Sequence, residues 1–154
     1  MSTMKLKARI QEDMKDAMRS GNSDQLKVIR LILSSIKQVE IDTRETIEED
    51  SAILTILNKM VKQRRDSISQ FELGNRKDLA EIELIEIAVL KKYLPEQLSE
   101  NEIDELINQS LIESSAEDIT KMGVVMSILK KKIGARADMG TISQKVKARL
   151  SKIS

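Results

Sequence analysis

Residues 93–102 read YLPEQLSENE and contain Pro95, the single proline of the chain. Proline disfavours helical geometry at the residue before it, so a helix that arrives here is expected to end near Leu94. Ser99 and Glu102 then have the spacing of a capping box, in which the serine oxygen and the glutamate carboxylate bind the free amides at a helix start. This stretch therefore predicts a boundary between two helical domains, residues 1–95 and 96–154.

Upstream of the boundary, apolar residues recur every three or four positions, which is the period of an amphipathic helix. The second of these segments has a wide apolar face, which suggests contact with more than one neighbour. A capping box at Thr46 and Glu49 is expected to start the third helix. A short turn at Gly74-Asn75 predicts that the third and fourth helices form an antiparallel hairpin. The expected helices cover about residues 4–19, 23–41, 46–73 and 77–94.

Downstream of the boundary, the same periodicity predicts three shorter helices. They begin at about Ser99, Asp118 and Thr141, and the last of them is expected to start at a capping box formed by Thr141 and Gln144. The predicted fold is therefore all-α, with a four-helix N-terminal lobe and a small three-helix C-terminal tail domain.

Composition excludes several kinds of function. The chain has 154 residues, 40% of them hydrophobic and 33% charged, and it contains neither cysteine nor histidine. Disulfides, thiol nucleophiles, histidine acid–base chemistry and cysteine or histidine zinc sites are thereby excluded. No phosphate-binding glycine loop or hydrolase motif is present, so no catalytic residue, metal or cofactor is expected, although a role within an enzyme complex stays open. With no long apolar run, we expect no membrane contact and a cytoplasmic location.

Charge is sorted along the last third of the chain. Residues 96–118 hold eight carboxylates and no base, whereas residues 119–154 hold nine bases and one acid. Such a local excess favours contact with phosphates or an acidic partner. Two glycines, Gly134 and Gly140, bracket a turn that could present Arg136 to a phosphate, or this turn could be an ordinary connection whose Arg136 and Asp138 bond to the loop itself. The candidate nucleic-acid-binding residues are Lys130, Lys131, Lys132, Arg136, Lys145 and Arg149.

Two charged residues interrupt apolar stripes in the first lobe. Arg64 lies four residues from both Met60 and Ile68, and Glu86 lies four residues after Ile82. A hairpin that turns at residues 74–75 places Arg64 and Glu86 at similar heights. We expect a half-buried ion pair that fixes the hairpin register; the alternatives are an acid–base pair or an Arg64 that faces solvent. The nearby basic edge of Lys59, Lys62 and Arg65 is interpreted as solvated surface.

Five segments in order resemble the GatB/YqeY family, that is, YqeY-like proteins. They are residues 62–67 (KQRRDS), 74–81 (GNRKDLAE), 93–99 (YLPEQLS), 122–126 (MGVVM) and 134–140 (GARADMG). One departure is Met139, which stands between the arginine-alanine-aspartate run and the glycine that normally follows it. The resemblance covers nearly the whole chain.

The resemblance implies a helical domain followed by a tail similar to the C-terminal part of the B subunit of the glutamine-dependent tRNA amidotransferase, where the tail helps to hold tRNA. The implied function is an amidotransferase-related accessory protein that binds tRNA or other RNA through the basic tail. The family label would be carbon–nitrogen ligase with glutamine as amido-N-donor, but the chain lacks the kinase-like domain and the amidase loop, so we expect no autonomous catalysis. The alternative is an adaptor that docks a protein partner through the charged tail.

Overall fold

A computed structural model describes residues 4–153 and confirms the all-α prediction, since these residues form helices and no strand. The chain divides into two compact units, Met1–Pro95 (unit 1) and Glu96–Ser154 (unit 2). Within residues 4–153, no helix has the length and apolar character needed to cross a bilayer.

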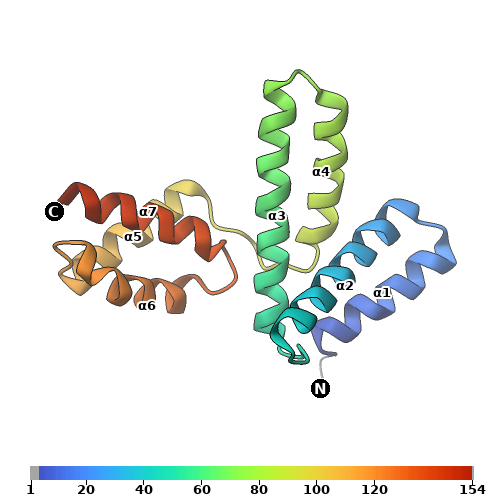
Figure 1. Cartoon of the computed structure of the whole chain (residues 1–154), viewed down its shortest axis with the longest axis horizontal. Coiled ribbons are helices and arrows are strands. Elements are labelled where there is room, and N and C mark those ends of the chain that lie inside the picture. Colours follow the sequence, from blue (N-terminus) through green and yellow to red (C-terminus); the bar gives the residue numbers. More distant parts are fainter. Residues whose placement is uncertain (1–3, 154) are drawn as a thin grey trace. The chain divides into compact units, whose positions relative to one another are not determined.

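Unit 1 consists of two helical hairpins (Figure 1). Its helices are α1 (Leu6–Ser20), α2 (Ser23–Thr43), α3 (Asp50–Leu73) and α4 (Lys77–Lys91). The α1–α2 turn is made by Gly21, whose φ of 72° is in the left-handed region that glycine adopts without strain. In the α3–α4 turn the left-handed residue is Asn75, with φ 58°, and not Gly74.

The core of unit 1 is aliphatic, as a chain with one tyrosine and one phenylalanine requires. All four helices contribute to it, because each presents one apolar face at helical spacing. Its fully buried large side chains are Ile10 of α1, Ile29, Ile32 and Ile36 of α2, Ile53 and Leu57 of α3, and Leu90 of α4.

The predicted capping box at Thr46 is wrong. Helix α3 begins at Asp50, and its N-cap Glu49 makes no side-chain cap bond. Tertiary hydrogen bonds fix the preceding segment instead: Ile47 donates its N–H to Glu40 Oε2 of α2 at 2.8 Å, and Leu6 donates its N–H to Asp50 Oδ1 at 3.0 Å. The hydrogen bond from Ile47, with help from Lys7, lowers the pKa of Glu40.

Unit 2 has α5 (Glu100–Ser114), a single 3-10 turn η1 (Ile119–Lys121), α6 (Met122–Ile133) and α7 (Met139–Ile153). The capping box at Ser99 is confirmed, because Ser99 donates its N–H to Glu102 Oε1 at 3.0 Å and accepts the Glu102 N–H at 3.2 Å. The fully buried large side chains of this unit are Ile107, Leu129, Ile133, Ile142 and Leu150.

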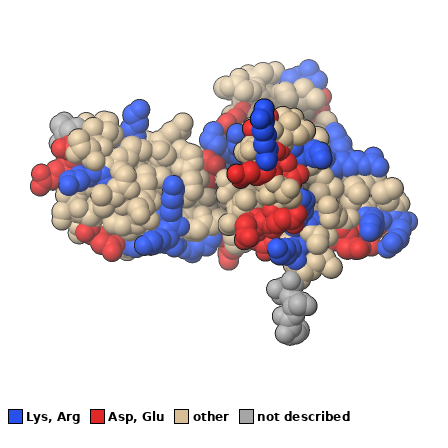
Figure 2. All heavy atoms as spheres, turned by 60° about the horizontal axis from the view of Figure 1, so that its bottom comes forward, with Lys and Arg blue, Asp and Glu red and all other residues tan. Residues whose placement is uncertain are grey.

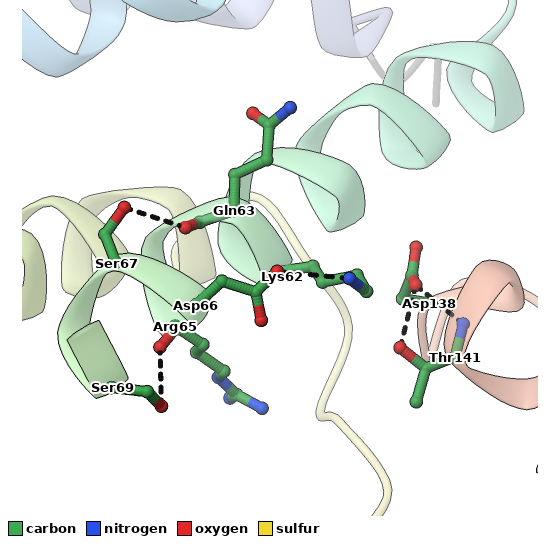
Figure 3. A network of polar contacts seen from close by, with 8 residues as sticks. All are labelled: Lys62, Gln63, Arg65, Asp66, Ser67, Ser69, Asp138 and Thr141. Carbon is green, nitrogen blue, oxygen red and sulfur yellow. Dashed lines mark hydrogen bonds and ion pairs between the residues drawn. The ribbon is translucent and has the colours of Figure 1, made fainter. Parts of the chain in front are cut away.

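The last helix starts earlier than predicted. Asp138 is the residue that binds its first amides: Asp138 Oδ2 accepts the Thr141 N–H at 2.9 Å and the Thr141 hydroxyl at 3.0 Å (Figure 3). The capping box predicted at Thr141 is therefore wrong, and Gly140 lies in the first turn of α7 instead of in a loop.

Candidate functional site

Three of the six candidate basic residues of unit 2 contact side chains of α5. Lys132 Nζ lies 2.8 Å from Glu113 Oε2, and Lys145 Nζ lies 3.3 Å from Asp104 Oδ1. Arg149 donates a hydrogen bond to the side-chain oxygen of Asn108. Two ion pairs thus join the acid-rich and base-rich stretches that are separate in the sequence.

Arg136 is bound to the end of α6, the helix that precedes it. Its Nη2 donates to the carbonyl oxygen of Lys132 at 2.6 Å, and its Nε donates to that of Ile133 at 3.3 Å. These carbonyls belong to the last turn of α6, where no further helical amide can reach them. Together with the Asp138–Thr141 bonds, this is the self-bonded connection that the sequence left open as an alternative to a phosphate-binding turn.

Two of the six candidate residues, Lys130 and Lys131, are exposed and have no ion pair within residues 4–153. On the face in view in Figure 2, basic and acidic side chains lie beside one another instead of gathering in one basic patch. Unit 2 therefore presents less free positive charge than its sequence suggests.

The expected ion pair of unit 1 is present in the structure. Arg64 Nε lies 2.7 Å from Glu86 Oε2, and the two side chains are only 13% and 11% exposed. Arg64 also donates to the Met60 carbonyl at 3.2 Å. Lys27 of α2, which the sequence analysis did not include, reaches Glu86 Oε1 at 3.8 Å. Glu86 therefore links three helices, which favours a structural role for Arg64 over an acid–base role.

The basic edge of α3 is ordinary surface. Lys59 and Arg65 are exposed, and Lys62 pairs with Asp66 one turn later at 3.2 Å (Figure 3). Exposed pairs of this kind have little energetic effect.

A polar cluster joins α1 to the end of α4. The Tyr93 hydroxyl donates to Asp13 Oδ2 at 2.6 Å, and the Arg9 guanidinium carbon lies 5.0 Å from the centre of the tyrosine ring. Burial, and then the hydrogen bond to Asp13, raise the pKa of Tyr93, while Arg9 opposes the shift. The cluster fixes the chain just before Pro95.

An open groove of about 430 Å³ runs along the outer face of α2. All of its lining residues belong to α2, and they combine apolar with basic side chains: Ser23, Leu26, Lys27, Arg30, Leu31 and Ser34. Leu26 and Arg30, like Lys27 and Leu31, are four positions apart, so they share one face of the helix. Arg30 is exposed and has no ion pair within the described residues.

Helix α4 carries apolar side chains that unit 1 leaves exposed. Ile82 is 46% and Ile85 is 49% exposed. Ile82 lies one turn before Glu86, the residue that contacts Lys27, and Ile85 lies one turn before the buried Val89. Ile82 and Ile85 therefore lie on the same side of α4 as Glu86 and Val89, the side that packs against the rest of unit 1 one turn later. We call the combination of Leu26, Lys27, Arg30, Leu31, Ile82 and Ile85 the α2–α4 surface.

Sequence reasoning missed this surface because helical periodicity alone does not show which apolar residues a neighbouring helix covers. The signal that could have found it is the wide apolar face of the second helix, which exceeds what one packing partner covers. Within residues 4–153, no group of three or more acidic side chains is placed to hold a metal ion.

The family model for YqeY-like proteins matches residues 7–150. This chain belongs to the YqeY-like protein family. The resemblance found in the sequence is thereby confirmed, and it spans both units.

Three curated relatives of this YqeY-like protein share the name "Altered inheritance of mitochondria protein 41, mitochondrial". The relative from Pyrenophora tritici-repentis is 36% identical over 141 residues, which cover 90% of this chain and 77% of the relative. The relative from Clavispora lusitaniae is 42% identical, over 73% of this chain and 67% of the relative. The relative from Kluyveromyces lactis is 31% identical, over 92% of this chain and 74% of the relative.

These names correct two expectations. The relatives are named for the inheritance of mitochondria, so the expected role as an amidotransferase-related, RNA-binding accessory protein is wrong. They are also named as mitochondrial proteins, which contradicts the expected cytoplasmic location. In unit 2, the charge that suggested RNA is reduced because Lys132 and Lys145 form ion pairs with α5 and Arg136 bonds to carbonyl oxygens at the end of α6.

Proposed function

We propose that this YqeY-like protein is a protein-binding module and that the α2–α4 surface of unit 1 is its contact surface. The observation that carries the proposal is the exposure of Ile82 and Ile85, at 46% and 49%, in the unit that also holds the leucine-lined groove of α2. Apolar side chains grouped at a surface with basic neighbours are typical of sites where another protein binds.

The chemistry of the surface defines the partner. Leu26 and Leu31 line the groove of α2, and Ile82 and Ile85 form an exposed apolar wall on α4, the helix that packs against α2. Lys27 and Arg30 supply positive charge at the same place. An amphipathic helix with an apolar stripe and acidic residues beside it satisfies both features, and helix-in-groove recognition uses this arrangement.

The base of this surface is held in place before any partner arrives. Glu86 contacts Arg64 of α3 and Lys27 of α2, so it fixes the approach of the two helices that carry the surface. A surface that is ordered in advance loses less conformational entropy on binding. We therefore assign the Arg64–Glu86 pair a positioning role in this function.

We further propose that the chain works as a four-helix N-terminal domain and a three-helix tail domain, divided at Pro95. The two aliphatic cores support this division, because one draws only on α1–α4 with the residues that follow α4, and the other only on residues after Pro95. In this proposal the N-terminal domain carries the contact surface.

The setting of the function is proposed from the relatives. Since they are named as mitochondrial proteins that affect the inheritance of mitochondria, we propose that this chain can perform their role when it is present in mitochondria. The α2–α4 surface would then contact a mitochondrial protein partner.

The test is complementation in Kluyveromyces lactis cells that lack their own relative. The chain is expressed with a mitochondrial leader, and the inheritance of mitochondria is scored. We expect the unmodified chain to restore inheritance and Ile85→Asp to abolish the rescue, because a carboxylate in the apolar wall excludes the partner.

Ile112→Asp is the matched control, since Ile112 is 79% exposed on unit 2 and lies outside the surface. Thermal unfolding of both variants verifies that they fold. If Ile85→Asp rescues as well as the unmodified chain does, the α2–α4 surface is not the contact surface.

A further inference from the structure

We propose that the α2–α4 surface binds a second copy of this chain, so that α4 of each copy lies against α2 of the other. This inference rests on the proposed function, because it names the partner of the same surface.

Helix α4 has the chemistry that the groove requires. Its exposed residues Ile82 and Ile85 form a short apolar stripe, and Glu81 lies one turn before Ile85 on the same side. Glu81 is exposed and has no ion pair within residues 4–153. Asp78 is already paired with Arg76 at 3.1 Å. Glu83 lies two residues before Ile85 and so on a different side of the helix, which leaves Glu81 as the unpaired carboxylate on the side of Ile85 among the described residues.

The groove of α2 offers the complementary set. Leu26 and Leu31 can receive the isoleucines, and the exposed Arg30 can meet Glu81 of the second copy. Within one chain no ion pair joins Arg30 to Glu81 among the described residues, so both charges are available to a partner. Each copy therefore carries one acidic apolar helix and one basic apolar groove.

Two-fold symmetry satisfies both features at once. In a symmetric dimer every contact occurs twice. If Arg30 of the first copy contacts Glu81 of the second, then Glu81 of the first copy also contacts Arg30 of the second. Two Arg30–Glu81 contacts then lie on either side of the two-fold axis, and the isoleucines of each α4 pack against Leu26 and Leu31 of the other copy. Lys27 stays bound to Glu86 within its own chain and holds each groove next to its α4.

The experiment is sedimentation velocity on the full chain, from about 10 µM to about 1 mM, a range that detects association free energies down to about 4 kcal/mol. We expect the unmodified chain to form a dimer in this range. Arg30→Glu and Glu81→Arg should each raise the dimer dissociation constant about tenfold or more, because each places two like-charge pairs in the interface.

The decisive sample is an equimolar mixture of the Arg30→Glu and Glu81→Arg chains. In a mixed dimer both contacts again join opposite charges, so the mixture should dimerise although neither variant does so alone. The double variant R30E/E81R should dimerise for the same reason. Ile112→Asp, with its substitution on an exposed residue of unit 2, should dimerise like the unmodified chain. An unmodified chain that stays monomeric at about 1 mM, or a mixture that stays monomeric, overturns the inference.

Failure of this inference is distinguishable from failure of the proposed function. A monomeric chain whose Ile85→Asp variant still loses complementation shows that the surface binds an acidic helix of another protein, so the second-copy inference falls and the proposed function stands. A dimer that Ile85→Asp breaks without any effect on the inheritance of mitochondria leaves the inference standing and refutes the proposed function.

Discussion

The two units of this YqeY-like protein differ in how the order of charges along the sequence relates to the ion pairs of the fold. In unit 2 the sequence separates acids from bases, yet the fold brings them together: Lys132 meets Glu113, and Lys145 meets Asp104. In unit 1 the charges are interleaved along the sequence, yet the fold leaves Arg30 and Glu81 exposed and without an ion pair among the described residues.

A run of like charge in a sequence therefore does not by itself produce a charged surface. The bases of unit 2 find partners 19 and 41 residues away, which no local window can show. In unit 1 the local balance of charge conceals an unpaired arginine beside two leucines. Surface charge therefore depends on which helices pack together. We expect the stability of the two units to depend on their ion pairs to different extents.

The largest effect is expected at the buried pair of unit 1. Arg64→Leu leaves Glu86 without its closest partner in a site where the two side chains are only 13% and 11% exposed, so unfolding should become easier by about 3 kcal/mol. Urea unfolding followed by the fluorescence of Tyr93, the single tyrosine, reports on unit 1.

The double variant R64L/E86L should be more stable than the sum of the two single losses implies, with a coupling above about 0.5 kcal/mol. Additive losses would show that the pair does not couple the hairpin helices and would weaken the contrast with unit 2.

A smaller loss is expected from Tyr93→Phe, which removes the hydrogen bond to Asp13. Hydrogen bonds to charged groups contribute about 1.5–3 kcal/mol, so a loss of about 2 kcal/mol is expected in urea unfolding followed by circular dichroism.

The pH dependence supplies a second readout of the same residue. Because folding raises the pKa of Tyr93 above its ordinary value of 10.0, the unfolded chain loses the phenolic proton first as pH rises. The stability of the unmodified chain should therefore fall as pH rises above about 10, and more steeply than that of the phenylalanine variant. Equal slopes for the two proteins would contradict the assigned environment of Tyr93.

The starts of α5 in unit 2 and α3 in unit 1 differ in their side-chain caps. Ser99→Ala removes one half of the capping box of α5 and should cost about 1 kcal/mol, measured by the hydrogen exchange of α5 amides. Thr46→Ala should be nearly neutral for α3, because that helix starts at Asp50 without a side-chain cap. A loss at Thr46 as large as that at Ser99 would mean that the box predicted at Thr46 forms in solution.

Acid should weaken the same α5 cap. The Ser99 backbone N–H, with its hydroxyl, lowers the pKa of Glu102 below the ordinary value of 4.5. The contribution of Glu102 is therefore present above that value and is lost as pH falls through the lowered pKa. In Glu102→Gln the protection of the first α5 amides from hydrogen exchange should no longer fall as pH is lowered through the pKa of Glu102. If the variant loses protection in acid as the unmodified chain does, Glu102 does not stabilise the cap as assigned.

The smallest effect is expected at the exposed pairs of unit 2. A double-mutant cycle on Lys145→Ala and Asp104→Ala should give a coupling of about 0.5 kcal/mol or less, because the two side chains are 30% and 51% exposed. Added salt should reduce the coupling further. A coupling as large as that of the Arg64–Glu86 pair would remove the energetic contrast between the units.

Most of the fold was predictable because helical periodicity and turn residues are local signals. The helices, the α3–α4 hairpin and the capping box at Ser99 all follow from residues within a few positions of one another. The starts of α3 and α7 were misplaced for a physical reason. The motifs at Thr46 and Thr141 have suitable spacing, but Ile47 is already bound to Glu40, and Asp138 binds the Thr141 amide first.

The candidate site was predictable only in part. The Arg64–Glu86 pair followed from two charges that interrupt apolar stripes on either side of one short turn. The contact of Lys27 with Glu86 could not be predicted, because the approach of α2 to α4 depends on tertiary packing between segments about sixty residues apart in sequence. The α2–α4 surface was missed for the same reason, since exposure of an isoleucine depends on which neighbours reach it.

The most direct test of the central claim compares one charge reversal in each unit in the Kluyveromyces lactis complementation assay. Arg30 and Lys131 are both exposed and have no ion pair within residues 4–153, so Arg30→Glu and Lys131→Glu are matched changes in charge. We expect Arg30→Glu to abolish the restored inheritance of mitochondria and Lys131→Glu to leave it intact. Loss of rescue with Lys131→Glu alone would place the contact surface on unit 2 and contradict the account.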